Sequence, residues 1–256
     1  MSVSDPLPEN LSDLLTAELT KLHDDDIFAY DLLVETRKQI WTGLGPSNHA
    51  SRASRLSKRV SVQPASMTFA DIVRAYIQIA TAEKLLPLWS SACDETERLV
   101  GPDDPGVIQQ QHQNYQKMTR SIPIEKISVY DVPRKLLPVH ILKLATLVLE
   151  QRDDDFEALL IQANDLWNIY ARPEQCEREF FIKWAVQDAL YEALGWNDRQ
   201  SFVLFRNAVY GYAGIFWGDS FESRRSTLAP FKRIEFWTWW LGEAVPEGWQ
   251  KMAQLT

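Results

Sequence analysis

The sequence predicts an all-α protein, and three observations carry that prediction. Apolar residues recur at spacings of three and four along most of the 256 residues. Glycine is scarce, with 10 residues, and the Asn-Gly and Asp-Gly pairs that favour β-hairpins are absent. Hydrophobic residues make up 45% and charged residues 24%, which is typical of a globular chain with a sizeable core. We expect about ten helices in two packed halves that form a single compact unit.

The first half is expected to span residues 1–121. Asp26 is placed to cap a helix over residues 27–43, which Gly45 and Pro46 would end. A second helix is expected directly after Thr68. Its apolar residues follow the helical rule and share one face: Phe69, Ile72, Val73, Tyr76, Ile77 and Ala80. Pro87 should kink or restart this element and give a further helix up to Gly101.

Residues 102–138 are expected to connect the two halves. Residues 102–106 contain two prolines, two aspartates and a glycine, which predicts a turn. The glutamine-rich residues 107–120 predict an exposed helix. Three prolines and several β-branched residues in 121–138 predict an irregular hinge with a short extended piece.

The second half, residues 122–256, reads as five further helices. They are expected near residues 138–151, 154–170, 174–194, 200–216 and 230–244. Gly195 and Gly218 would end two of them, and Pro230 suits the first turn of the last. Aromatic residues lie around most of that last helix, which we therefore expect at the centre of this half: Phe231, Phe236, Trp237, Trp239 and Trp240.

Charge and cysteine usage limit the partners and the compartment. The net charge of −8 disfavours nucleic acid and anionic membranes and favours a cationic partner. Cys93 and Cys176 form no CxxC pair, which suits a reducing compartment. The first residues carry no apolar signal segment, and the apolar stretch 136–149 is too short and too polar to span a bilayer. We expect a cytoplasmic protein.

The sequence offers no catalytic signature. Phosphate-binding loops, the dinucleotide-binding glycine motif, the serine elbow and HExxH are absent. The four histidines are His23, His49, His112 and His140, and no two of them share a helix face at metal-ligand spacing. We therefore expect no catalytic residue, no metal, no cofactor and no enzyme activity, and each histidine is expected to be structural.

Two aspartate clusters are the candidate partner-binding residues. The first consists of Asp24, Asp25 and Asp26, and the second consists of Asp153, Asp154, Asp155 and Glu157. Both precede predicted helices, where aspartates cap free amides and meet the positive end of the helix dipole. The second cluster also has the form DDxxE, which holds magnesium in all-helical terpene synthases, so Asp153, Asp154 and Glu157 are the first residues to test for a metal.

The C-terminal part resembles a known family. Residues 179–198 are rich in alanine and aromatic residues, and residues 233–241 read R-x-x-F-W-x-W-W-L. This combination resembles the helical group of immunity proteins of bacterial polymorphic-toxin systems. The resemblance implies a cytoplasmic bacterial protein that binds a toxin stoichiometrically and catalyses nothing. A basic toxin would match the acidic charge of the chain.

Three functional hypotheses remain open from the sequence. The first is a protein-binding module that acts as an immunity protein. The second is a helical adaptor or structural interaction protein that uses the same acidic surface, and the oligomeric state stays open in both. The third is a helical metal-dependent enzyme that uses Asp153, Asp154 and Glu157.

Overall fold

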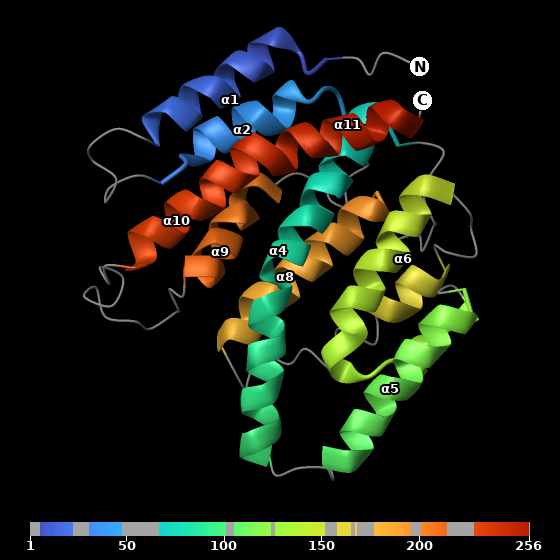
Figure 1. Ribbon diagram of the computed structural model, residues 1–256. Helices are drawn as coiled ribbons and strands as arrows, with labels where there is room; N and C mark the ends of the chain where they lie inside the picture. Colours follow the sequence, from blue (N-terminus) through green and yellow to red (C-terminus); the bar gives the residue numbers. More distant parts are fainter. Residues whose placement is uncertain are drawn as a thin grey trace, which may run out of the picture.

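The computed structural model confirms the all-α prediction for the residues that it describes. These are residues 6–22, 31–47, 67–100, 105–123, 126–151, 158–164, 167, 177–195, 201–213 and 228–255. They contain nine named α-helices and no strand, and their helices pack into one compact unit (Figure 1). The helices are α1 (Glu9–Lys21), α2 (Val34–Gly43), α4 (Phe69–Val100), α5 (Pro105–Ser121), α6 (Leu137–Gln151), α8 (Glu177–Ala193), α9 (Ser201–Ala213), α10 (Leu228–Trp239) and α11 (Val245–Leu255).

The centre of the molecule is the pair α4 and α8, which make the most extensive helix contact. Helices α6 and α9 also pack on α8, and α11 packs on α4. Figure 1 shows α10 and α11 running across one side of this pair. The prediction that the last helix is central is therefore wrong. Helix α10 buries Phe236 and Trp237, but Phe231 is 54% exposed and Lys232 and Glu235 face solvent.

A single hydrophobic core joins segments from both sides of residue 121. Trp89 of α4 lies against Trp167, with ring centroids 5.0 Å apart, and Trp41 of α2 meets Phe205 of α9 at 5.2 Å. Aromatic pairs of this kind add about 0.5–1.5 kcal/mol each beyond the area that they bury. The division into 1–121 and 122–256 stays a prediction, while the core itself is continuous.

Helix α2 begins later than the sequence predicts. Residues 31–33 are not helical, and the helix starts at Val34 instead of Ile27. Two tertiary contacts oppose the helix here, because Leu32 is buried and the Asp31 carboxylate accepts a hydrogen bond of 3.0 Å from the Trp237 indole. The predicted Asp26 cap lies outside the described residues.

Helix α4 starts after Thr68 as predicted, but it does not restart at Pro87. It runs unbroken from Phe69 to Val100, so no separate helix ends at Gly101. A proline removes one backbone donor from a helix and leaves a carbonyl without its usual partner. Pro87 is exposed, so water can reach this backbone, while Leu85 and Trp89 hold the helix in the core.

The connection between α5 and α6 is compact rather than extended. Helix α5 confirms the helix predicted over 107–120, and its described side chains are mostly exposed. The extended piece predicted in 121–138 is not found in the described residues, which form short 3-10 turns at Val129–Asp131 and Arg134–Leu136. Ile127 and Val132 are buried, and the Trp89 indole donates to the Lys135 carbonyl at 3.1 Å. Tertiary contacts therefore outweigh the β-propensity of this segment.

The C-terminal helix is longer than predicted. Pro230 lies in the first turn of α10, as expected, but the helix continues beyond Ala244 through a π-helical turn, Trp240–Ala244, into α11. The Val245 amide donates to the Trp240 carbonyl, five residues back. A π-turn realigns the hydrogen bonds of a helix, and this one lies directly before Pro246, which has no amide hydrogen to donate.

The remaining predictions for the second half are confirmed where the chain is described. Residues 158–164 are helical, and α6, α8 and α9 match their predicted positions within a few residues. Gly195 follows α8 with a φ of +64°, the left-handed conformation that favours glycine at a helix end. Gly218 lies outside the described residues.

Candidate functional site

A row of buried polar side chains runs through the contact between α4 and α8, and we call it the polar seam. Helix α4 contributes Asp71, Arg74 and Gln78, which are three and four residues apart and therefore share one face. Helix α8 contributes Asp188 and Glu192 at the same spacing. All five side chains are at most 6% exposed. Burial of polar groups in a core is unfavourable unless they are paired, so their contacts reveal their role.

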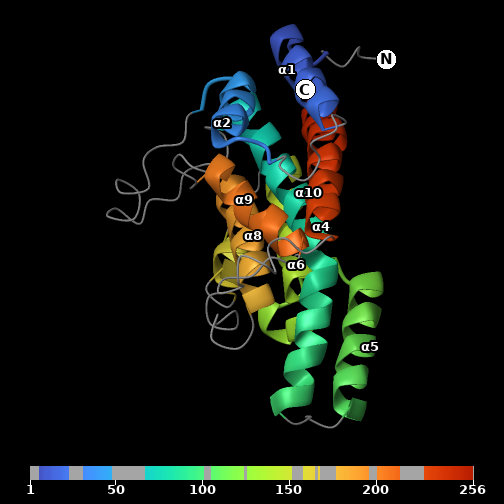
Figure 2. The same ribbon diagram turned by 90° about the vertical axis from the view of Figure 1, so that its left-hand side faces the viewer.

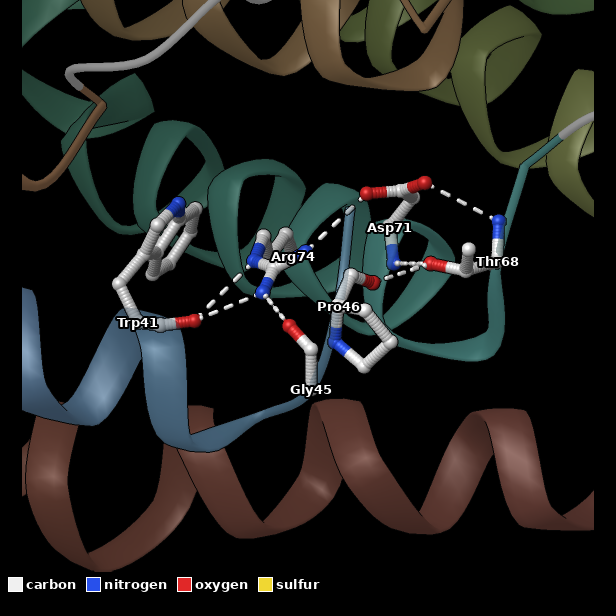
Figure 3. Close-up of polar contacts among 6 residues, drawn as sticks. All are labelled: Trp41, Gly45, Pro46, Thr68, Asp71 and Arg74. Carbon is white, nitrogen blue, oxygen red and sulfur yellow. Dashed lines mark hydrogen bonds and ion pairs between the residues drawn. The ribbon is translucent and has the colours of Figure 1, made fainter. Parts of the chain in front are cut away.

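At the N-terminus of α4, Asp71 and Thr68 cap each other (Figure 3). The Asp71 amide donates to the Thr68 hydroxyl at 3.1 Å, and the Thr68 amide donates to the Asp71 carboxylate at 3.0 Å. This reciprocal pattern satisfies two of the amides that a helix start leaves free. The Thr68 hydroxyl also donates to the Pro46 carbonyl at 2.8 Å, which fixes the residue after α2 to the start of α4.

Arg74 uses its guanidinium to hold α2 in place. It donates to the Trp41 carbonyl through two nitrogens, at 3.2 and 2.9 Å, and also to the Gly45 carbonyl. Its remaining bond is an ion pair with Asp71 at 3.1 Å (Figure 3). The Trp41 carbonyl belongs to the last turn of α2, where helix carbonyls lack partners, and the Gly45 carbonyl lies just after that helix. Burial lowers the pKa of Arg74, and the nearby charges of Asp71 and Glu192 oppose this shift.

One turn further along, α4, α8 and α9 enclose a small pocket that we call the Asp188 cleft. Its polar lining is Gln78, Thr81 and Asp188. Its apolar lining is Phe181, Trp184, Ala185, Phe205 and Ala208. The enclosed space is about the size of one water molecule. Trp184 is 36% exposed, so the cleft has one large aromatic side chain that reaches the surface.

The polar groups of the Asp188 cleft are not satisfied in the way that Arg74 is. Among the described residues, nothing donates a hydrogen bond to the Asp188 carboxyl, and the Gln78 amide nitrogen is buried without a partner. Thr81 donates to the Ile77 carbonyl at 2.8 Å, which leaves its oxygen able to accept. Burial raises the pKa of Asp188 well above its usual range, and the charge of Glu192 adds to this effect.

The described side chains of the polar seam contain more acid than base. The carboxyl groups of Asp71, Asp188 and Glu192 are accompanied by one guanidinium, that of Arg74. Arg74 forms its ion pair with Asp71, and no basic side chain of the described residues contributes to the pKa shift of Asp188. A cation that entered the cleft would therefore meet favourable charge.

A second buried titratable group lies between α5 and α6. The Tyr115 hydroxyl and His140 Nδ1 are 3.0 Å apart, and the two rings meet edge to face. Burial lowers the pKa of His140 to about 4, with a smaller contribution from the charge of Lys143, so the ring is neutral at pH 7. Burial also raises the pKa of Tyr115 to about 12. The pair lies against no pocket described here and joins two helices.

A third polar cluster lies at the surface, where α4, α9 and α10 meet. The Tyr212 hydroxyl donates to the Glu235 carboxylate, which also pairs with Lys232 at 3.0 Å. The ammonium groups of Lys84 and Lys232 lie over the Tyr212 ring, 5.6 and 5.2 Å from its centre. Hydrogen bonds to Tyr212 and Lys232 lower the pKa of Glu235. Each acid in this cluster has a base beside it, in contrast to Asp188.

The candidate residues chosen from the sequence are not among the described residues that line this site. Asp24 to Asp26, Asp153 to Asp155 and Glu157 all lie outside the described residues, so their proposed partner contacts stay predictions. Within the described ranges, no three His, Cys, Asp or Glu side chains are grouped to hold a metal ion. The sequence did contain a signal for Asp188, since an acidic pair with a spacing of four interrupts the otherwise apolar face of α8.

Comparisons of the chain with protein-family models, with curated protein sequences and with solved structures found no match. In the described part of the chain, no helix combines the length and the apolar character needed to cross a membrane. A functional assignment therefore depends on the chemistry of the chain itself, and the Asp188 cleft is the feature with the most specific chemistry.

Proposed function

We propose that this chain is a cytoplasmic protein-binding module that recognises a basic partner protein. The observation that carries the proposal is the Asp188 cleft, which is lined by both a buried acid and a tryptophan that reaches the surface. Tryptophan is enriched among the residues that dominate binding energy at protein interfaces. A buried acid beside it supplies selectivity for a positive group.

The size of the cleft favours binding over catalysis. A space of about one water molecule does not enclose a substrate, but it accepts the end of one side chain while the rest of a partner lies on the surface. Interface anchors of this kind fill small pockets near the centre of a contact. The cleft is therefore better suited to anchor a partner than to perform a reaction.

The overall charge supports the same assignment. A chain with a net charge of −8 attracts a basic protein over several ångströms and accelerates their association. A toxin that attacks nucleic acid must be basic to hold phosphate, so the resemblance to immunity proteins makes such a toxin the first partner to test. An adaptor that recruits a basic protein without inhibiting it would use the same cleft.

The test is reconstitution of a complex from purified proteins. The tagged full chain is purified from its native cells, the enriched proteins are identified, and each basic candidate is purified and titrated with the wild-type chain and with Trp184→Ala. We expect a defined stoichiometric complex whose Kd rises with salt, and a Kd at least about tenfold higher for Trp184→Ala, which corresponds to about 1.4 kcal/mol.

Two controls test whether the effect is specific to Trp184 and whether binding inhibits the partner. Phe231→Ala removes another exposed aromatic side chain, on α10, and should change the Kd less than twofold. Growth rescue during co-expression with the partner distinguishes inhibition of a toxin from recruitment by an adaptor. The proposal fails if no purified candidate forms a complex, or if the purified chain turns over a small molecule instead.

A further inference from the structure

We propose that the Asp188 cleft binds a primary ammonium group, and that the lysine side chain of a partner protein supplies it. The source of the ammonium depends on the proposed function, whereas the ammonium site itself depends only on the cleft. The inference combines three properties of the cleft: its size, its unused hydrogen-bonding atoms and its charge.

Size selects the ammonium among the cations of proteins. The ammonium of lysine is compact and stands at the end of a flexible four-carbon stem, whereas the guanidinium of arginine is a planar fork with five donors. The cleft has space for about one water molecule, and an ammonium group is close to that size. An arginine or a quaternary ammonium would need Phe181 or Phe205 to move, and both are buried in the core.

The hydrogen-bonding atoms of the cleft match an ammonium group. An ammonium has three donors and no acceptor. Asp188 and Thr81 offer oxygens with free lone pairs, and rotation of the Gln78 amide about its last bond presents its oxygen. In the empty cleft, the Gln78 nitrogen has no partner among the described residues. With the Gln78 amide rotated in this way, the cleft offers one acceptor oxygen for each of the three donors of an ammonium group.

Charge and aromatic walls favour a cation over water. The neighbouring groups of Asp188 in the polar seam are Glu192 on its own helix and, on α4, Arg74 with its partner Asp71. The guanidinium of Arg74 is already held by carbonyls and Asp71. Phe181, Trp184 and Phe205 also line the cleft, and aromatic rings attract cations at their faces.

Binding is coupled to release of a proton. In the empty cleft, burial and the charge of Glu192 disfavour the anion of Asp188 and raise the pKa of its carboxyl group. An entering ammonium stabilises the carboxylate, so the carboxyl proton leaves to solvent while the N–H bonds of the ammonium stay intact. The net change is one ammonium bound and up to one proton released, and no other co-reactant is involved.

The test is a titration of the full chain followed by NMR at the Trp184 indole and the Gln78 side-chain amide. The probes are methylammonium, the amide of N-acetyl-lysine, the amide of N-acetyl-arginine and tetramethylammonium, each at matched ionic strength. We expect saturable shifts with the first two probes and none with the last two. Asp188→Asn keeps the size of the side chain and should raise the Kd for methylammonium at least about tenfold.

Glu235→Gln is the matched control variant. It removes an exposed acid that lies beside Lys232, outside the cleft, and should leave the Kd for methylammonium unchanged. Calorimetry in two buffers of different ionisation enthalpy then counts the protons released, which we expect for the wild type and not for Asp188→Asn.

The outcomes separate this inference from the proposed function. Tighter binding of the lysine amide than of methylammonium supports a protein lysine as the source, and equal binding supports a free amine. Absence of saturable shifts in the wild type, or equal shifts in Asp188→Asn, would show that the cleft holds only water, and the inference fails. A partner complex that survives Asp188→Asn unchanged would retain the proposed function and remove the lysine anchor from it.

Discussion

The two ends of the polar seam, around Arg74 and around Asp188, both contain buried polar side chains but differ in how these side chains are hydrogen-bonded. Around Arg74, each donor that the structure describes reaches a carbonyl or the Asp71 carboxylate. Around Asp188, one turn further along, the carboxyl has no hydrogen bond among the described residues and borders a cleft that opens beside Trp184. Figure 2 shows α4 as a long helix that starts near α2 and extends to the end of the molecule beside α5, and this helix supplies Arg74 at one end of the seam and Gln78 at the other.

This difference separates stability from binding. Where backbone carbonyls satisfy a buried charge, its removal exposes unpaired groups and destabilises the fold. Where a buried acid faces a small opening without a partner, a ligand can supply the missing contact. We therefore expect substitutions at the Arg74 end to change the free energy of unfolding and substitutions at the Asp188 end to change binding and pH dependence.

The largest expected effect is that of Arg74→Met. The variant leaves Asp71 buried without its ion pair and leaves the carbonyls of Trp41 and Gly45 without donors. We expect a loss of about 3–5 kcal/mol in the free energy of unfolding, measured by urea denaturation. Lys38→Met removes an exposed charge of α2 and should change it by less than about 0.5 kcal/mol. Equal effects of the two variants would contradict the structural role of Arg74.

His140 is a buried group that is only partly satisfied, so it is intermediate between Arg74 and Asp188. Its Nδ1 contacts Tyr115, while its Nε2 has no partner among the described residues. The folded state holds its pKa at about 4, below the ordinary 6.5, so protonation favours the unfolded chain. Stability from this group is full above pH 6.5 and falls as the pH drops towards 4. We expect the difference in unfolding free energy between wild type and His140→Gln to shrink by about 3 kcal/mol from pH 7 to pH 4.

Urea denaturation of both proteins at several pH values measures this change. The variant serves as its own reference, because the other titrating groups are common to both chains. A difference that stays constant over this range would mean that His140 is not held neutral by burial.

The wall of the cleft provides the next test, at Gly211 of α9. A Cβ at this position would lie 2.7 Å from the Cβ of Phe181, which is closer than packed atoms approach. We expect Gly211→Ala to lower the free energy of unfolding by about 1–3 kcal/mol and to weaken binding of methylammonium, since Phe181 must shift.

Gly242→Ala is the matched control in the π-turn. Its Cβ would meet nothing closer than Leu19, at 4.0 Å, and the position is exposed. We expect it to raise stability by up to about 1 kcal/mol, because alanine loses less backbone entropy than glycine in a helix. Equal destabilisation by both variants would indicate backbone strain rather than close packing at Gly211.

A smaller effect is expected for Thr68→Ala. It removes the cap of the Asp71 amide and the hydrogen bond to the Pro46 carbonyl. We expect a loss of about 1–2 kcal/mol in unfolding free energy, with methylammonium binding unchanged. Thr68→Ser keeps the hydroxyl and should recover most of the loss. Weaker methylammonium binding by Thr68→Ala would show that the Arg74 end of the seam affects binding at the Asp188 end, which would contradict their separate roles.

The helices can be predicted from the sequence because local residues mark where many of them begin and end. Thr68 and the apolar spacing after it mark the start of α4, and Gly195 marks the end of α8. The errors arise where distant residues decide. The Asp31–Trp237 contact delays α2, and the exposed side of Pro87 lets α4 continue. Neither the partner of Asp31 nor the exposure of Pro87 is visible in the sequence.

The candidate site shows the same limit more strongly. Asp188 and Glu192 have helical spacing, but only the packing of α4 on α8 brings Gln78 and Thr81 to the same cleft as Asp188. Aspartate triplets are conspicuous because they are consecutive in the chain, whereas a cleft is assembled from three helices. Periodicity therefore predicts the core and leaves the site undetermined.

The sharpest contrast with Arg74 is that of Asp188→Asn, whose effect on stability is expected to be small only near pH 4. Burial and Glu192 raise the pKa of Asp188, so above the ordinary carboxyl pKa the unfolded chain loses a proton that the folded chain keeps. The folded state of the wild type therefore loses stability as the pH rises, and asparagine removes this loss.

We expect Asp188→Asn to match the wild type near pH 4 and to exceed it in unfolding free energy at pH 7, as measured by urea denaturation at both pH values. Methylammonium should raise the stability of the wild type more than that of the variant, because asparagine lacks the negative charge that strengthens binding of a cation. A variant less stable than the wild type at pH 7 without ligand would show that Asp188, like Arg74, stabilises the fold. A buried acid whose role is binding is instead expected to lower the stability of the protein while the cleft is empty.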